Sequence, residues 1–208
     1  MPAVTWSRTL WEPWTVSFGP TGPYAVAAMH ASQVLGLGEG RSCLVIGSAP
    51  AEAVTLASLD WRVTHLDYRQ LDPETPWPFT VCQGDAMALP FPDHTFDAIS
   101  STCVLCHVGT GRYGDPQQAD GEARMLRECR RVLRPGGSFV CSPGPVYLGD
   151  DPVDLPPHRV TTVEAFHRLV QAHGWHVQHC AVGGINTDFS FSTDPTAPDY
   201  LCATLEAC

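Results

Sequence analysis

The chain has 208 residues, of which 44% are hydrophobic and 16% are charged, so its composition excludes a disordered chain and fits one globular domain. Twelve basic residues against 22 acidic ones give a net charge of −10, which disfavours binding to nucleic-acid phosphates and to anionic lipid surfaces. All twelve basic residues are arginines, so the sequence excludes covalent catalysis by lysine.

The first 23 residues differ from the rest of the chain. Trp6, Trp11 and Trp14 stand there among several prolines and glycines. This composition is typical of an irregular arm packed over other parts of a protein. We therefore divide the chain into an N-terminal arm at 1–23 and one domain at 24–208.

From Tyr24 onward, helical patterns alternate with short apolar runs. Four helices are predicted, at 24–35, 51–59, 120–133 and 163–172. Seven strands are predicted, at 43–46, 62–67, 79–82, 96–100, 138–141, 175–182 and 199–205, with a Pro-rich loop at 143–157. Strands that alternate with helices predict a single-domain, doubly wound α/β fold whose sheet is mostly parallel.

In such a sheet, ligands bind beyond the carboxyl ends of the strands. The first strand ends at Gly47, and Asp67 ends the second strand twenty residues later. This spacing matches a carboxylate that binds ribose hydroxyls next to a turn that opens a helix. Only one of the three usual glycines is present, so an ordinary strand-to-helix turn remains an alternative for this segment taken alone.

Two further segments carry a family resemblance. Gly-Asp-Ala-Met-Ala-Leu-Pro-Phe-Pro-Asp-His-Thr-Phe-Asp begins at Gly84, and Arg-Val-Leu-Arg-Pro-Gly-Gly begins at Arg131. Both segments, in this order and at this distance, resemble class I S-adenosylmethionine-dependent methyltransferases of the type 11-like group. The resemblance covers roughly residues 20–208. A narrower similarity, at 107–116, is to a bacterial branch of methyltransferase-like proteins.

The resemblance implies a Rossmann-like methyltransferase fold with the last strand antiparallel, and S-adenosyl-L-methionine as the cofactor. It also implies eight cofactor-binding residues: Gly47, Ser48 and Ala49 under the methionine part, Asp67 at the ribose, Asp85 and Ala86 at the adenine, and Ser101 and Thr102 on the methionine side. The chemistry agrees, because a carboxylate accepts hydrogen bonds from both a ribose diol and an exocyclic amine.

The chain departs from the family pattern at the first turn. Val45 stands where the family usually has an acidic residue, and Ala49 and Ala51 replace later glycines. Each alanine adds a methyl group where backbone and cofactor approach closely. An alternative is therefore a catalytically weak or inactive module that acts through a protein partner. A dinucleotide-dependent oxidoreductase is disfavoured, because the segments at Gly84 and Arg131 resemble the other family.

Three candidate catalytic residues follow the fourth strand: His107, Tyr113 and Asp115. An acceptor would approach the activated methyl group there, and an imidazole can take a proton from a hydroxyl or an amine. A histidine that only bonds to backbone in a turn is an equal alternative for His107. The expected acceptor is a small molecule, and the sequence identifies neither the methylated atom nor the oligomeric state.

The cysteines bear on metal binding and on location. Cys103-Val-Leu-Cys106-His107 matches the attachment pattern of haem c, but that attachment needs an exported chain, and the chain shows no export signal and no long apolar run. The nine scattered cysteines are expected to be reduced core residues. We therefore expect a cytoplasmic protein with no membrane segment and no metal site.

Overall fold

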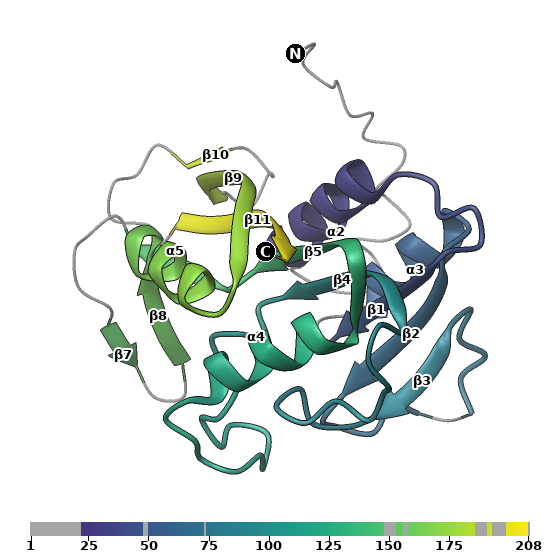
Figure 1. Ribbon diagram of the computed structural model, residues 1–208, viewed down its shortest axis with the longest axis horizontal. Helices are drawn as coiled ribbons and strands as arrows, with labels where there is room; N and C mark the ends of the chain where they lie inside the picture. The colour runs from purple at the N-terminus through teal and green to yellow at the C-terminus, as the bar shows by residue number, and fades with distance from the viewer. Residues whose placement is uncertain are drawn as a thin grey trace.

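The computed structural model of the chain describes residues 22–47, 50–72, 74–147, 153–155, 158–185, 191–192 and 199–207. Its helices are α2 (Gly22–Leu35), α3 (Pro50–Ser58), α4 (Gly121–Val132) and α5 (Val163–Ala172). Its strands are β1 (Ser42–Ile46), β2 (Arg62–Asp67), β3 (Thr80–Gln83), β4 (Phe96–Thr102), β5 (Leu133–Ser142), β6 (Pro145–Tyr147), β7 (Val153–Leu155), β8 (His158–Thr162), β9 (Trp175–Ile185), β10 (Phe191–Ser192) and β11 (Asp199–Ala207). Figure 1 shows their arrangement.

The sheet follows the predicted doubly wound plan. Its first five strands lie in the order β3-β2-β1-β4-β5, and each neighbouring pair is parallel. The last strand, β11, is antiparallel and lies between β5 and β9. These seven strands confirm the predicted seven-stranded sheet and its antiparallel last strand.

Helices cover both faces of this sheet because the strand residues alternate in direction (Figure 1). In β1, Leu44 and Ile46 pack in the core cluster that contains residues of α4 and α5. Cys43 and Val45 pack in the other cluster, with residues of α2 and α3. The apolar run of β1 is therefore buried on both faces, as expected for a central parallel strand.

Predicted and observed elements differ in two places. Within the described residues, the sheet also includes β6, β7, β8 and β10, which were not predicted. These strands have between two and five residues, and two of them fall in the predicted Pro-rich loop. The predicted arm lies outside the described residues, except for positions 22 and 23, which begin α2.

Among the described helices, none is both long enough and apolar enough to cross a bilayer.

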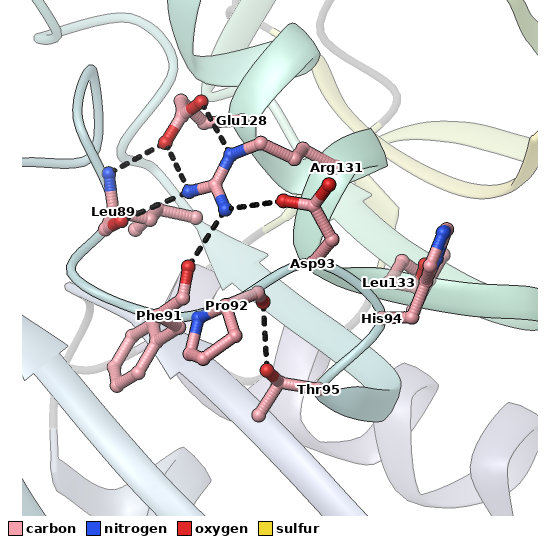
Figure 2. Close-up of polar contacts among 9 residues, drawn as sticks. All are labelled: Leu89, Phe91, Pro92, Asp93, His94, Thr95, Glu128, Arg131 and Leu133. Carbon is pink, nitrogen blue, oxygen red and sulfur yellow. Dashed lines mark hydrogen bonds and ion pairs between the residues drawn. The ribbon is translucent and has the colours of Figure 1, made fainter.

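Arg131 of α4 fixes the segment that leads into β4 (Figure 2). Its guanidinium donates hydrogen bonds to the carbonyl oxygens of Leu89 (2.9 Å) and Phe91 (2.7 Å), and it pairs with the carboxylates of Glu128 and Asp93. Glu128 in turn accepts a hydrogen bond from the Leu89 amide. These contacts, which we call the Arg131 clamp, tie the segment that follows Asp85 and Ala86 to helix α4.

Arg131→Met is expected to lower the free energy of unfolding by about 2 kcal/mol, because two backbone carbonyls and a half-buried carboxylate lose a charged donor. Urea unfolding measures this change. Arg124→Met is the matched control on the same helix. Arg124 forms an exposed pair with Asp120, so its loss is expected to leave the free energy of unfolding nearly unchanged. Equal losses of unfolding free energy in the two variants would contradict a stabilising role for the Arg131 clamp.

Asp97 joins β4 to the start of β1. Its carboxylate accepts hydrogen bonds from the Ser42 amide (2.8 Å), the Ser42 hydroxyl (2.8 Å) and the Arg134 guanidinium (2.6 Å). Burial alone would raise the pKa of Asp97, but these hydrogen bonds outweigh burial and hold the pKa at about 2. The ionised carboxylate therefore stabilises the folded state.

Asp97→Asn is expected to be less stable than wild type by about 2 kcal/mol at pH 7, from the difference between about 2 and the unfolded pKa of about 3.9. Because the folded pKa is depressed, the wild-type advantage is complete above about pH 5 and is lost progressively as the pH falls to about 1. Urea unfolding of both proteins at several pH values tests this. A stability difference that is independent of pH would contradict it.

Candidate active site

A cavity of about 320 Å³ opens at the carboxyl ends of β1, β2 and β4. Of the eleven predicted site residues, eight line it: Gly47, Asp67, Asp85, Ala86, Thr102, His107, Tyr113 and Asp115. Ser48 and Ala49 lie outside the described residues. Ser101 is buried and does not line the cavity, and its hydroxyl has no hydrogen-bond partner within the described structure.

Gly47 makes the turn at the end of β1 possible. Its φ of 58° lies in the left-handed region, and a Cβ added there would meet a methyl carbon of Val104 at 2.6 Å. Its carbonyl oxygen lies 2.8 Å from Nε2 of His65. Burial lowers the pKa of His65, so a neutral imidazole donates its Nε2 proton to this carbonyl. The turn is thus supported by a buried histidine of β2.

Asp67 ends β2 and is buried, at the position predicted for the ribose carboxylate. In this structure both of its oxygens bind Arg69. Arg69 Nε donates to Oδ1 (3.0 Å), its second guanidinium nitrogen donates to Oδ2 (2.8 Å), and its backbone amide also donates to Oδ1 (2.8 Å). The sequence prediction placed the carboxylate but missed Arg69, whose only signal is a basic residue two positions later.

Asp85 and Ala86 lie on the loop after β3, where they form the adjacent wall of the cavity. The Asp85 carboxylate accepts a hydrogen bond from the Met87 amide at 2.8 Å, and the Ala88 amide donates to the Asp85 carbonyl at 3.0 Å. This small turn orients Asp85 beside the cavity. The contacts of Arg131 begin four residues after Asp85, at Leu89.

The loop after β4 forms the opposite wall. His107 is 7% exposed, and its ring meets the Tyr113 ring edge-on with centroids 5.7 Å apart. Asp115 accepts hydrogen bonds from the backbone amides of Gly109 (3.0 Å), Gly111 (3.3 Å) and Tyr113 (3.1 Å). The Asp115 carboxylate therefore organises the loop that carries the other two candidates.

A buried acid that sequence reasoning missed lies near the first turn. Glu52 of α3 is 2% exposed, and its carboxylate accepts a hydrogen bond from the Ser100 hydroxyl. Ser100 is the register partner of Val45, the position where the family pattern has an acid. Helix α3 thus places a carboxylate beside the position at which β1 lacks the acidic residue of the family pattern. The signal for Glu52 was a lone glutamate at the start of a predicted helix.

The two cysteines of the Cys103–Cys106 pair are largely held apart from solvent. Burial raises the pKa of Cys103, and it raises the pKa of Cys106 to about 12, so both thiols are protonated at neutral pH. Both are free, and the Cys106 thiol points to the carbonyl of Cys103 at 3.6 Å. Across the described ranges, no three His, Cys, Asp or Glu side chains form a metal-binding group.

Comparison with known proteins adds a family match. A family model described as a methyltransferase domain matches residues 34–141, more than half of the chain. Demethylmenaquinone methyltransferase of Bacillus licheniformis is 30% identical over 104 residues, which cover 50% of this chain and 40% of that protein. The chain thus matches less than half the length of this relative.

Two solved structures share the fold. The cyclase SpnF has a TM-score of 0.69 at 17% identity, over 88% of this chain and 80% of that chain. The 1,6-didemethyltoxoflavin-N1-methyltransferase of Burkholderia thailandensis, solved with 1,6-didemethyltoxoflavin and S-adenosylhomocysteine, has a TM-score of 0.66 at 17% identity, over 96% of this chain and 82% of that chain. At this identity, the likeness concerns the fold alone.

Proposed function

Because the chain belongs to the methyltransferase-domain family, we propose that it is a class I S-adenosylmethionine-dependent enzyme that transfers the methyl group of this cofactor to a small-molecule nucleophile. The observation that supports this most is the cavity that joins Gly47, Asp67 and Asp85 on one side to His107 on the other. Its position at the carboxyl ends of parallel strands is the usual ligand site of such sheets.

The residues of the cavity fit the cofactor. The Asp67 carboxylate suits the ribose diol, while Asp85 and Ala86 form the wall assigned to the adenine. The turn at Gly47 has no Cβ to fill the space under the methionine part. We also assign Ser48 and Ala49 to this part and Thr102 to the methionine side, whereas Ser101 is buried outside the cavity. When bound, the cofactor supplies an electrophilic methyl group, and the chain's own residues position the acceptor in line with it.

We assign the proton-accepting role to His107, since it is the histidine that lines the cavity. Tyr113 contacts its ring and shields it, and Asp115 holds the loop of both residues through backbone amides. An acceptor hydroxyl or amine that enters beside His107 would lose its proton to the imidazole as the methyl group is transferred.

Size and charge support the small-molecule class. The cavity of about 320 Å³ is at the lower end of the range for ligand pockets, and the net charge of −10 opposes a nucleic-acid acceptor. The eight described cysteines are all free, which supports a reducing, cytoplasmic location.

Calorimetric titration of the full chain with S-adenosylmethionine, S-adenosylhomocysteine and NAD tests the proposal. We expect binding heat with both sulfur ligands and none with NAD. Absence of heat with either sulfur ligand, from a protein shown to be folded by circular dichroism, would overturn it.

A second candidate is a methyltransferase-like module that binds a protein partner and has weak or no activity. Two departures from the family pattern favour this candidate. Val45 replaces the usual acidic residue, and Ala49 and Ala51 each add a methyl group where the family has a glycine. The buried Glu52 carboxylate favours the first candidate, because it accepts a hydrogen bond from Ser100, the register partner of Val45. The same titration identifies a module that has lost cofactor binding, since such a module gives no heat with the sulfur ligands. A module that still binds them is separated from the enzyme by the absence of methyl transfer.

A further inference from the structure

Arg69 binds the carboxylate of Asp67, which the proposed function assigns to the ribose of the cofactor. Two guanidinium nitrogens bind the two oxygens of Asp67 in a bidentate pair, at 3.0 and 2.8 Å. A ribose diol would need the same oxygens, because its two hydroxyls donate to one carboxylate. Cofactor ribose and Arg69 therefore compete for Asp67.

Arg69 is the more exposed partner of this pair. Its side chain is 55% exposed, so water can solvate the guanidinium once it leaves Asp67. A bound ribose has the remaining contacts of the cofactor to hold it in place. We therefore expect the cofactor ribose to displace Arg69 from Asp67.

A displaced Arg69 guanidinium already has a second contact beside the candidate base. Its central carbon lies 4.7 Å from the centroid of the Tyr113 ring, and this ring lies 5.7 Å from the His107 ring. The Tyr68 hydroxyl, which donates to the Gly114 carbonyl at 3.2 Å, keeps the two loops together. Arg69 can leave Asp67 and remain at the acceptor side of the cavity.

The charges around the cavity indicate what Arg69 would then bind. Among the described residues that line it, Asp67, Asp85 and Asp115 are acidic, and Arg69 is the only arginine. An anionic acceptor would find its cationic partner in Arg69 alone. Since Arg69 already holds a carboxylate in bidentate geometry, the matching group on the acceptor is another carboxylate.

We propose that Arg69 recognises a carboxylate on the acceptor, and that it becomes available for this only after the cofactor ribose has replaced it on Asp67. This inference rests on the proposed function. It makes Arg69 a specificity-determining residue and makes cofactor binding the first step of an ordered reaction.

The test uses benzoate as the probe and benzamide as its uncharged analogue, both titrated into the full chain by ligand-observed NMR. In the presence of saturating S-adenosylhomocysteine, we expect benzoate to bind at least tenfold more tightly than benzamide. Without S-adenosylhomocysteine this preference is expected to fall below threefold, because Arg69 returns to Asp67. Arg69→Met should abolish the preference and should itself bind S-adenosylhomocysteine a few-fold more tightly.

Arg112→Met is the matched control. Arg112 lies over the same Tyr113 ring, at 5.6 Å, but does not line the cavity, so its removal is expected to keep the preference for benzoate. Equal binding of the two probes, a preference that survives in Arg69→Met, or one that does not depend on S-adenosylhomocysteine would each overturn the proposal. Failure of S-adenosylhomocysteine to bind wild type would instead count against the proposed function.

Discussion

Replacement of His107 by alanine is expected to lower the rate of methyl transfer by a factor of about 10²–10⁴, the usual contribution of a general base. Cofactor affinity should change by no more than a few-fold, because His107 is not among the residues assigned to the cofactor. The measurement is a single-turnover assay of S-adenosylhomocysteine formation with an accepted substrate, alongside calorimetric titration of the cofactor.

His107 is buried, so the variant needs a check on folding. Thermal unfolding and S-adenosylhomocysteine affinity supply it, and His107→Gln, which keeps a polar side chain, is a second variant that should lose as much rate. His176→Ala is the matched control, since His176 is an exposed histidine of β9 outside the cavity. A rate within tenfold of wild type in both His107 variants would remove His107 from the mechanism and leave Tyr113 as the next candidate.

Asp67→Ala is expected to weaken S-adenosylhomocysteine binding by about 1.5–3 kcal/mol, the range for hydrogen bonds to a charged group. That range is roughly a 10- to 150-fold increase in the dissociation constant. Calorimetric titration at low and high salt measures the change.

Asp72→Ala is the control for Asp67. Asp72 lies on the loop that follows Asp67 and is exposed. Its carboxylate accepts hydrogen bonds from the Glu74 amide and the Thr75 hydroxyl. Its removal is expected to leave affinity unchanged. An unchanged affinity in a folded Asp67→Ala variant would place the ribose contact elsewhere.

The sequence predicted the central sheet because buried parallel strands are short apolar runs that helices separate. Cys43 to Ile46 is such a run, and its four side chains divide between the two core clusters. The strands β7 and β10 have only three and two residues, too few for any periodicity to appear. Their pairing depends on neighbours that are distant in the sequence.

The positions of the candidate site residues followed from strand ends, but the partners of their side chains did not. Asp115 accepts three backbone hydrogen bonds because Gly109 and Gly111 have positive φ values and curve the loop around it. The pair between Asp67 and Arg69 likewise depends on the path of the chain beyond β2. Such contacts arise from loop geometry, which residue type and spacing leave undetermined.

The place of β11 has a consequence for the order of folding. Strands β1 to β5 lie within residues 42–142, whereas β11 at Asp199–Ala207 enters between β5 and β9. Pairing with β5 must close a loop of more than fifty residues, which makes it a slow, late event. Until then the facing edges of β5 and β9 carry unpaired backbone groups that can template aggregation. Substitutions in β11 should therefore act on the yield of folded protein, far from the chemistry of the cavity.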